Sequence, residues 1–281
     1  MRGHRLPPPT SFLSSCLQQS HPPQIARAML TVTFKNIWAG WKDAPLSTLG
    51  ESQAAALGQA FNKSNTKFDF IYASDLLRAY ATGQAVLDFH SSPKPPFKSD
   101  QRLREQHFGI AEGHRWVMET PSDMTYEEMY AQGIFPILRG RDAKFPEAES
   151  LNDLAHRADS AIADCVVPHL AAAATAEVHI AIASHGLCIS ELVAALLRLD
   201  PDSRRDISYA GLLNTAWTRA TVSIRDGSLS GTTTTPPLNV TVTDVNNSDH
   251  LADLDVNVEE ATSLDDEKAA ARAFFGGKAV A

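Results

Sequence analysis

The chain has 281 residues, of which 43% are hydrophobic and 21% are charged, and its formal net charge is −8. This length allows one large α/β domain with a substantial buried core. The acidic balance argues against a general nucleic-acid-binding protein, and no apolar run is long enough to cross a bilayer.

The amino-terminal part of the chain alternates between strand and helix patterns. Residues 1–29 contain arginine, serine and runs of proline, and we expect them to form a disordered extension. The β-branched sequence LTVTF at residues 30–34 predicts the first strand. Ser47 or Thr48 can then cap a helix with apolar residues at helical spacing. The sequence FDFIYAS at residues 68–74 predicts a second strand, and LLRAYATGQAVLDF predicts the helix after it.

The middle of the chain is less regular. An extended segment, FKSDQRLRE, ends in the carboxylate of Glu105. Residues 111–149 are rich in methionine, tyrosine, glycine and proline, which predicts an irregular cap with one short helix near residues 126–132. A long amphipathic helix follows from Glu149, and we expect it to end near Pro168.

The carboxyl-terminal part supplies the remaining strands. VHIAIAS at residues 178–184 is the most apolar of them, and HGLCISELVAALLRL follows as a helix. AWTRATVSI at residues 216–224 is expected to close the sheet, and LNVTVTDV at residues 238–245 is expected to add an edge strand. Residues 246–281 are acidic and then alanine-rich, which predicts a peripheral tail.

Alternating strands and helices predict an α/β fold, a three-layer α/β/α sandwich with a mostly parallel central sheet. We therefore divide the chain into an extension at residues 1–29, one domain at residues 30–245 and a tail at residues 246–281. The three cysteines are odd in number and far apart, without the spacing of a disulfide framework or a metal site. This pattern favours a reducing, cytoplasmic compartment.

Polar residues follow three of the predicted strands or extended segments. Ligands of open α/β sheets bind beyond the carboxyl ends of the strands, so these residues are functional candidates by position. They are Ser74, Asp75 and Arg78 at the first junction, Glu105, His107 and Gly109 at the second, and Ser184, His185 and Gly186 at the third.

Three of these side chains have the chemistry to handle a phosphate group. His185 precedes a helix whose N-terminal N–H groups favour an anion, and Arg78 could hold two phosphate oxygens with its planar guanidinium. Glu105 could protonate a leaving oxygen. Each also has a structural alternative, because His185 could simply cap its helix while Arg78 and Glu105 could be solvated surface charges.

Ordered motifs resemble those of a known family, the histidine phosphatase superfamily, whose best-known branch is the cofactor-dependent phosphoglycerate mutases. The resemblance covers residues 30–224, and the motifs are WAGWKDAPLSTLGESQA, SDLLRAYAT, LREQHFGIAEG, ESLNDLAHR and ASHGLCISEL. It implies a mutase-like α/β/α sandwich with a phosphate pocket at the strand ends.

The resemblance also implies roles for individual residues. Arg78 corresponds to a phosphate-clamping arginine, and Glu105 corresponds to the proton donor. His185 corresponds to the second histidine, which stabilises the transferring phosphoryl group, and the adjacent Gly186 is expected to contact the phosphate with it. Asn214, in LLNTAWT, is a weaker match to a residue near the pocket.

The chain departs from this family at its first strand. Members of the family carry Arg-His-Gly directly after that strand, and this histidine becomes phosphorylated, whereas here Phe34 is followed by Lys35 and Asn36. Residues 35–46 still suffice to join a strand to a helix, because such loops need only about 2 to 6 residues. The fold is therefore expected to form, while phosphoryl transfer is expected to be lost or severely impaired.

Three interpretations of function follow. The first is a phosphatase lineage, because the cap is shorter than the basic insertion of the mutases. In this interpretation the natural product carries a complete loop. The second is a phosphoglycerate mutase-type phosphotransferase, which WAGWKDAPLS favours. The third is a non-catalytic pseudoenzyme that binds phosphate esters through Arg78 and His185.

The expected partners follow from the same resemblance. The ligand is expected to be a small phosphorylated metabolite, with no nucleic acid and no membrane as partner, and no metal ion or organic cofactor is implied. The sequence leaves the choice between a monomer and a homodimer open. It does not specify the substrate either.

Overall fold

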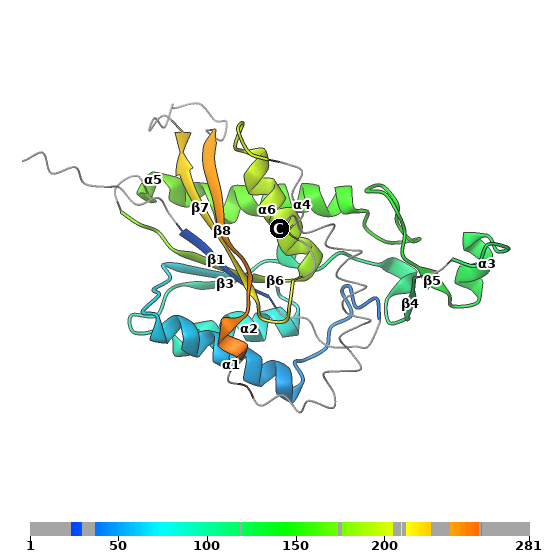
Figure 1. Cartoon of the computed structure of the whole chain (residues 1–281), viewed down its shortest axis with the longest axis horizontal. Helices are drawn as coiled ribbons and strands as arrows, with labels where there is room; N and C mark the ends of the chain where they lie inside the picture. Colours follow the sequence, from blue (N-terminus) through cyan, green and yellow to red (C-terminus); the bar gives the residue numbers. More distant parts are fainter. Residues whose placement is uncertain are drawn as a thin grey trace, which may run out of the picture.

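The computed structural model of the chain describes residues 24–29, 37–118, 120–173, 176–204, 209, 212–225, 237–252 and 254. Its centre is a six-stranded sheet with the order β3-β2-β6-β1-β7-β8 (Figure 1). The strands are β1 Gln24–Met29, β2 Phe70–Ala73, β3 Phe97–Ser99, β6 Ile180–Ser184, β7 Trp217–Ile224 and β8 Leu238–Asn247. β3, β2, β6 and β1 are parallel, and β7 and β8 add on in the antiparallel direction.

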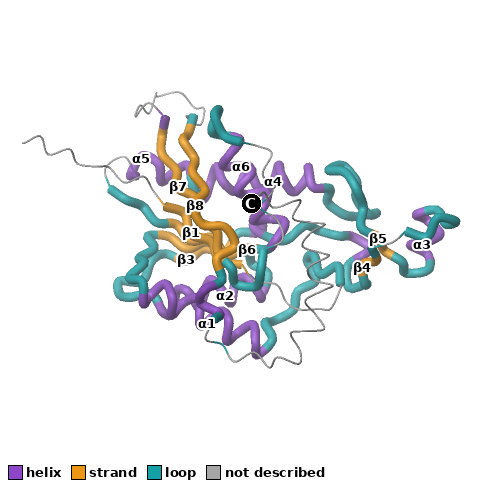
Figure 2. Tube along the Cα trace, in the orientation of Figure 1, coloured by secondary structure: helices purple, strands orange, loops and turns teal. Residues whose placement is uncertain are grey.

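Helices cover both faces of this sheet, which confirms the predicted three-layer sandwich. On one side lie α1 Thr48–Lys63 and α2 Leu77–Phe89, and on the other lie α4 Leu151–Cys165 and α6 Gly186–Arg198 (Figures 1 and 2). Alternate residues of β6 pack into the apolar clusters on the two faces of the sheet. Ile180 and Ile182 pack on the α4 and α6 side, whereas Ala181 packs on the α1 and α2 side.

Capping side chains begin two of these helices. The hydroxyl of Ser47 accepts a hydrogen bond from the N–H of Gly50 at 3.1 Å and starts α1. Ser150 and Asp153 form a reciprocal capping box at the start of α4. The predicted alternatives for the first helix are thereby resolved, because Ser47 is its cap and Thr48 is its first residue.

The first strand lies earlier in the sequence than predicted. β1 is formed by Gln24–Met29, inside the segment that we expected to be a disordered extension, and residues 30–34 lie outside the described residues. LTVTF has the higher intrinsic β propensity, but pairing with neighbouring strands outweighs propensity. β1 is inserted between β6 and β7, so it is a central strand of the sheet.

The described chain resumes after β1 at Ile37. This residue forms an isolated antiparallel bridge with Arg115, which holds it against the cap.

The cap consists of residues 111–149 and projects from one end of the sandwich (Figure 1). It contains β4 Trp116–Val117, α3 Tyr126–Ala131 and β5 Phe135–Pro136, so the predicted short helix is present. Its own apolar cluster unites Trp38 and Phe108 with the cap residues Ala111, Phe135, Ile137 and Phe145. Trp38 thereby fixes the cap to the segment that precedes α1.

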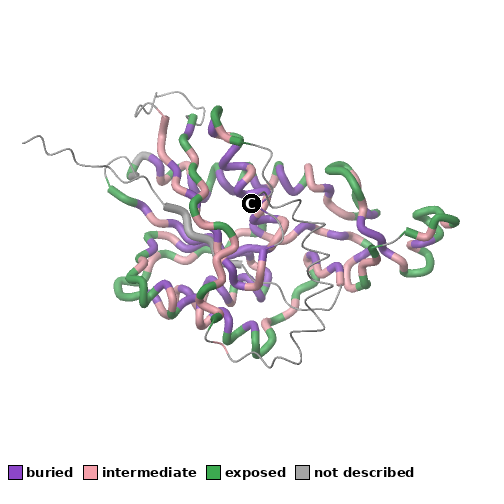
Figure 3. The backbone as a smooth tube through the Cα atoms, viewed as in Figure 1, coloured by how far each residue is buried: buried purple, intermediate pink, exposed green. Residues whose placement is uncertain are grey.

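Short elements complete the chain. They are η1 Gln101–Leu103, η2 Gly109–Ala111, η3 Val167–His169, α5 Leu170–Ala173 and η5 Asp249–Leu251. Figure 3 shows buried residues concentrated at the sheet and the inner helix faces, and exposed residues at the tip of the cap around α3. No helix among the described residues is long and apolar enough to span a membrane.

The predicted edge strand is present as β8, which continues to Asn247 and so crosses the boundary that we placed between domain and tail. Most of residues 246–281 lie outside the described residues. The division of the chain into domain and tail stays a prediction.

Candidate functional site

The predicted site residues lie where parallel strands end at one edge of the sheet. In the pairing of β2 with β6, Ala73 is level with Ala183, so Ser74 and Ser184 follow at the same height. His185 comes next and is the residue that precedes α6. Because β2 and β6 are neighbours, the first and third predicted junctions meet.

His185 is almost completely buried, with 2% of its surface exposed. Its Nε2 shares a 2.9 Å hydrogen bond with the hydroxyl oxygen of Ser74, which also accepts from the N–H of Leu76 at 3.2 Å. Burial, followed by the charges of Arg78 and Arg157, lowers the pKa of His185 well below 6.5. The imidazole is therefore neutral at pH 7, and its own side chain does not cap α6.

Arg78 is buried in the first turns of α2, with 3% of its surface exposed. Its terminal nitrogens donate to the carbonyl oxygens of Gly40 at 2.7 Å and Lys42 at 3.2 Å. Burial lowers the pKa of Arg78, and the negative charge of Glu105 is the largest opposing cause. The alternative of a solvated surface arginine is wrong for this position.

Glu105 lies at the N-terminus of α6. One carboxylate oxygen accepts from the N–H groups of Gln106 at 2.9 Å and Cys188 at 3.2 Å, and the other accepts from the N–H of Leu187 at 3.3 Å. Burial is the main cause that raises the pKa of Glu105, against these hydrogen bonds and the charge of Arg78. A raised pKa is what a carboxyl group needs in order to donate a proton.

Arg157 holds the loop that carries Glu105. It forms hydrogen bonds to both carboxylate oxygens of Glu149 at 2.9 and 2.7 Å. It also donates to the carbonyl oxygens of Arg102 and Arg104, each at 2.8 Å, and of Glu105 at 3.0 Å. The sequence pattern ESLNDLAHR begins with Glu149 and ends with Arg157, but nothing in it indicates that the arginine supports the acid loop.

Trp41 supports the same loop from the segment before α1. Its indole Nε1 donates to the carbonyl oxygen of Glu105 at 2.7 Å, and its backbone N–H donates to a carboxylate oxygen of Glu112 at 2.8 Å. The guanidinium of Arg104 lies 4.8 Å from the centre of the indole, and the ring of His107 also lies 4.8 Å away. Sequence reasoning missed this role, although the motif WAGWKD was the available signal.

Asp75, at the first junction, serves the framework. Arg104 and Asp75 form a pair of hydrogen bonds at 2.7 and 2.6 Å, which joins the second junction to the first. Gly186 is the first residue of α6, next to His185.

Asn214 lies in a turn before β7, and within the described residues its side chain forms no hydrogen bond to Arg78, Glu105 or His185.

The histidine that the resemblance predicts after the first strand is absent from the sequence that follows β1. β1 ends with Met29 level with Ser184, one residue before His185. The residues that follow, from 30 to 47, include no histidine and no cysteine. In the part of the chain that the structure describes, no three His, Cys, Asp or Glu side chains gather as a metal ion would require.

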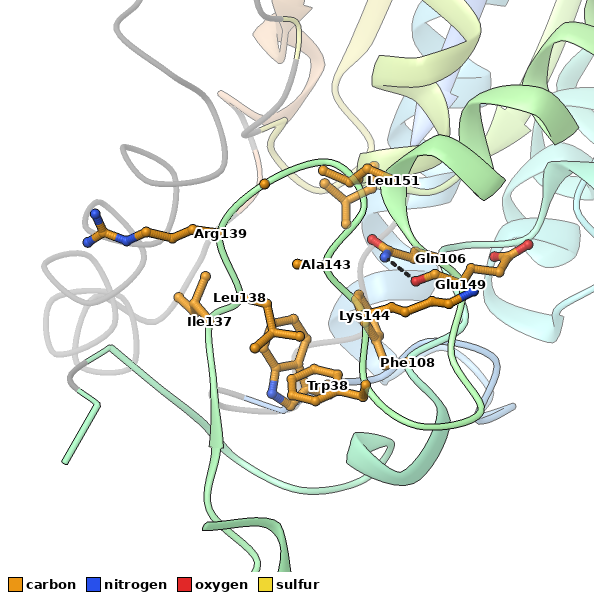
Figure 4. A pocket seen from close by; sticks show the side chains of 13 residues that line it. Trp38, Gln106, Phe108, Ile137, Leu138, Arg139, Ala143, Lys144, Glu149 and Leu151 are labelled. Atoms are coloured by element: carbon orange, nitrogen blue, oxygen red, sulfur yellow. Dashed lines mark hydrogen bonds between the residues drawn. The ribbon is translucent and has the colours of Figure 1, made fainter. Parts of the chain in front are cut away.

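A cavity of about 280 Å³ lies between the cap and the sandwich, beside this site (Figure 4). None of Arg78, Glu105 and His185 lines it, but Gln106 and Leu187, which neighbour Glu105 and His185 in sequence, do. The lining residues are Trp38, Gln106, Phe108, Ile137, Leu138, Arg139, Gly140, Ala143, Lys144, Phe145, Glu149, Leu151 and Leu187.

Known proteins match the chain over most of its length. A sequence profile of the Histidine phosphatase superfamily (branch 1) matches residues 31–231. The 2,3-bisphosphoglycerate-dependent phosphoglycerate mutases of Brucella melitensis biotype 2 and Brucella ovis are each 30% identical to it over 169 residues, covering 60% of this chain and 77% of their own length.

Solved structures share the fold. A mycobacterial glucosyl-3-phosphoglycerate phosphatase in complex with inorganic phosphate matches with a TM-score of 0.58 and 21% identity, covering 82% of this chain and 100% of that protein. A phosphoglycerate mutase from Bacillus anthracis str. Sterne matches with a TM-score of 0.58 and 21% identity, covering 83% and 96%. At this level of identity the likeness establishes the fold.

Proposed function

Because the chain belongs to the histidine phosphatase superfamily, we propose that it binds the phosphate group of small phosphomonoesters at the strand ends without forming a phosphohistidine. One observation carries the proposal: Arg78, Glu105 and His185 gather at one edge of the sheet, while residues 30–47 contain no histidine. The groups that would hold a phosphate are therefore present without the group that would accept the phosphoryl.

The charges around this edge favour an anion even though the whole chain is acidic. Both Arg78 and Arg157 act electrostatically on His185. A guanidinium has five N–H donors, and Arg78 uses two terminal nitrogens for the carbonyl oxygens of Gly40 and Lys42. Donors of Arg78 remain for phosphate oxygens, and a neutral imidazole can donate one N–H as well.

His185 is a poor replacement for the missing nucleophile. Its Nε2 is already engaged with Ser74, and the ring is buried beside Arg78. Attack on phosphorus would require it to leave this hydrogen bond and to give up the contact that stabilises the phosphate. In other members of the family, a histidine after the first strand makes the in-line attack from within contact distance, and this chain lacks that histidine.

The experiment pairs a binding measurement with a turnover measurement. Calorimetric titration with inorganic phosphate and with 3-phosphoglycerate should show binding that Arg78→Ala weakens by about tenfold or more, as expected for loss of a charge-assisted contact. Hydrolysis of para-nitrophenyl phosphate should stay at the level of the buffer. Turnover that disappears on His185→Ala would overturn the non-catalytic proposal.

Restoring the family's loop provides the complementary gain-of-function test. The family's motif directly follows the first strand, so Arg-His-Gly inserted between Phe34 and Lys35 can act only if LTVTF takes the place of Gln24–Met29 in the sheet. A variant that folds in this way should produce an acid-labile phosphoenzyme and measurable hydrolysis. The matched control inserts Arg-Ala-Gly at the same point and should remain inactive. Hydrolysis by the loop-restored variant would indicate a phosphomonoesterase lineage. Sequencing the transcript across the codons of Phe34 and Lys35 would find a natural product with a complete loop.

A mutase lineage is a second candidate, supported by the names of the Brucella relatives. The loop-restored variant separates the two candidates. With 3-phosphoglycerate and catalytic 2,3-bisphosphoglycerate, a mutase lineage gives 2-phosphoglycerate, whereas a phosphatase lineage gives inorganic phosphate. We also propose a reducing, cytoplasmic setting, because the three cysteines of the sequence have neither the number nor the spacing of a disulfide framework, and cell fractionation tests this.

A further inference from the structure

The walls of the cavity beside the site are mainly apolar. The rings of Trp38 and Phe108 lie 4.6 Å apart, and Phe145 packs edge-on against Trp38 at 5.4 Å. The polar atom of Trp38 is occupied, because its Nε1 donates to the carbonyl oxygen of Phe135 at 3.2 Å. Ile137, Leu138, Leu151 and Leu187 complete an apolar lining.

Three of the four polar side chains of the lining have protein partners, and Figure 4 shows the fourth, Arg139, directed away from the other lining residues. Gln106 donates through its side-chain nitrogen to the carbonyl oxygen of Glu149 at 2.7 Å, which Figure 4 shows as a dashed line. The carboxylate of Glu149 accepts two hydrogen bonds from Arg157 and one from the N–H of His107. Lys144 forms an ion pair with Asp153 at 3.0 Å. A ligand with several hydroxyl groups would have to displace these contacts or leave its hydroxyls unpaired.

The cavity begins next to the carboxyl group that would protonate a leaving oxygen. Gln106 directly follows Glu105, and the N–H of Leu187 donates to Glu105 at 3.3 Å. An ester whose leaving oxygen lies at Glu105 would then have Leu187, and with it the cavity, next to its organic part. The volume of about 280 Å³ is close to the lower range of ligand pockets.

We propose that this cavity receives the organic part of the bound ester, and that the ligands are phosphate monoesters of apolar, ring-containing alcohols in preference to phosphoglycerates or sugar phosphates. This inference rests on the proposed phosphate site, since it specifies which ester that site binds. Aromatic walls with satisfied polar groups favour a ligand that needs no hydrogen bonds beyond those of its phosphate.

Three probes separate this inference from the proposed function. Calorimetric titrations of the full chain with inorganic phosphate, 3-phosphoglycerate and 1-naphthyl phosphate compare the phosphate alone, a polar ester and an aromatic ester. The expected result is that 1-naphthyl phosphate binds at least about tenfold more tightly than either of the others. Equal affinities of the three would overturn the inference and leave the phosphate site intact. Absence of binding by all three would overturn both.

A substitution that fills the cavity locates the effect. Ala143 lines the cavity on the loop between β5 and α4, and Ala143→Leu should reduce the ratio of the affinities for 1-naphthyl phosphate and inorganic phosphate toward one. Leu77→Ala, at a side chain that is 50% exposed on α2, is the control and should leave the ratio unchanged. An unchanged ratio in a folded Ala143→Leu protein would contradict the assignment of the cavity. If that variant does not fold, Leu138→Ala provides the same readout.

Discussion

The indole Nε1 of Trp41 donates a 2.7 Å hydrogen bond to the carbonyl oxygen of Glu105, across 64 positions of sequence. This contact ties the segment before α1 to the loop that carries the proton-donor candidate. Arg157 donates to the same carbonyl oxygen from α4. The backbone of Glu105 is therefore fixed from two directions while its side chain reaches the start of α6.

Trp41→Phe tests the value of the indole hydrogen bond. The substitution removes one partner of a carbonyl oxygen that Arg157 still satisfies, so we expect a loss of about 1 kcal/mol in the free energy of unfolding. Urea denaturation followed by circular dichroism measures it. Trp116→Phe is the control for the smaller ring, since within the described residues the indole of Trp116 packs on the apolar cluster of the cap and forms no hydrogen bond. Equal losses in the two variants would argue against a specific role of the hydrogen bond.

Arg157→Met should be among the most destabilising changes of a charged residue. It leaves the carboxylate of Glu149 without its charge partner and three loop carbonyl oxygens without this donor. Loss of one partner from a buried pair costs about 3 to 5 kcal/mol. The control is Arg198→Met, which breaks the more exposed ion pair with Asp159 and should cost about 0 to 1 kcal/mol. Similar unfolding midpoints for the two variants would contradict this prediction.

Gly58→Ala tests the close approach of α1 and α2. A Cβ atom at Gly58 would lie 2.7 Å from the carbonyl oxygen of Ala85 and 2.8 Å from a ring carbon of Phe89. Alanine favours a helix by about 1 kcal/mol over glycine, but overpacking costs about 1 to 3 kcal/mol, so we expect a net loss of thermal stability. Gly50→Ala, where the nearest contact is a leucine side-chain atom at 3.3 Å, should be neutral or stabilising.

Buried His185 makes stability depend on pH. Its pKa in the folded protein is well below 6.5, so below pH 6.5 the unfolded chain binds a proton that the folded protein does not. Stability is therefore fully present above pH 6.5 and is lost as the pH falls toward the folded pKa, by at most about 1.4 kcal/mol per pH unit. His185→Asn should flatten this part of the curve, which denaturant unfolding at a series of pH values measures. An unchanged curve for His185→Asn would contradict the burial of a neutral imidazole.

Glu105 makes the stability of the fold depend on pH with the opposite sign. Its pKa is raised above 4.5 by burial, so above pH 4.5 the unfolded chain releases a proton that the folded protein retains. Stability from this group declines as the pH rises from 4.5 toward its folded pKa. Glu105→Gln should remove the decline, which denaturant unfolding between pH 4 and pH 8 would reveal. A steeper decline in Glu105→Gln would show that the sign is wrong.

The sequence predicted the parallel core well where local signals were strong. β2 and β6 are apolar runs followed at once by polar residues, so both the strands and the positions of Arg78 and His185 could be read from the chain. The motif LREQHFG placed Glu105 as well. The family and the three-layer fold are confirmed by the profile match and the structural likeness.

Other features depend on contacts that no local pattern encodes. β1 was predicted from β propensity at residues 30–34, but the order of the sheet assigns Gln24–Met29 to this position. Trp41 and Arg157 reach the acid loop from distant segments, so their roles appear only once the chain is folded.

Asn214 illustrates the limit of a two-residue motif. The following Thr215 has a φ of 53°, and its hydroxyl donates to the carbonyl oxygen of Asn214 at 2.8 Å. The pair thus forms a turn that leads into β7. Asparagine and threonine are frequent in turns for this reason, and a role of Asn214 near the pocket stays a prediction.

The position of β1 has a consequence for how the protein is made. Gln24 pairs with Thr221, and Ile25 pairs with both Ile180 and Ala220, so a strand from the start of the chain is completed only by partners from its far end. On the ribosome, β1 must wait until most of the sequence has emerged. Until then the edges of β1 are open to pairing with other chains. We expect folding during synthesis to be slow and to benefit from chaperones, because sheet closure requires contacts of such high sequence separation.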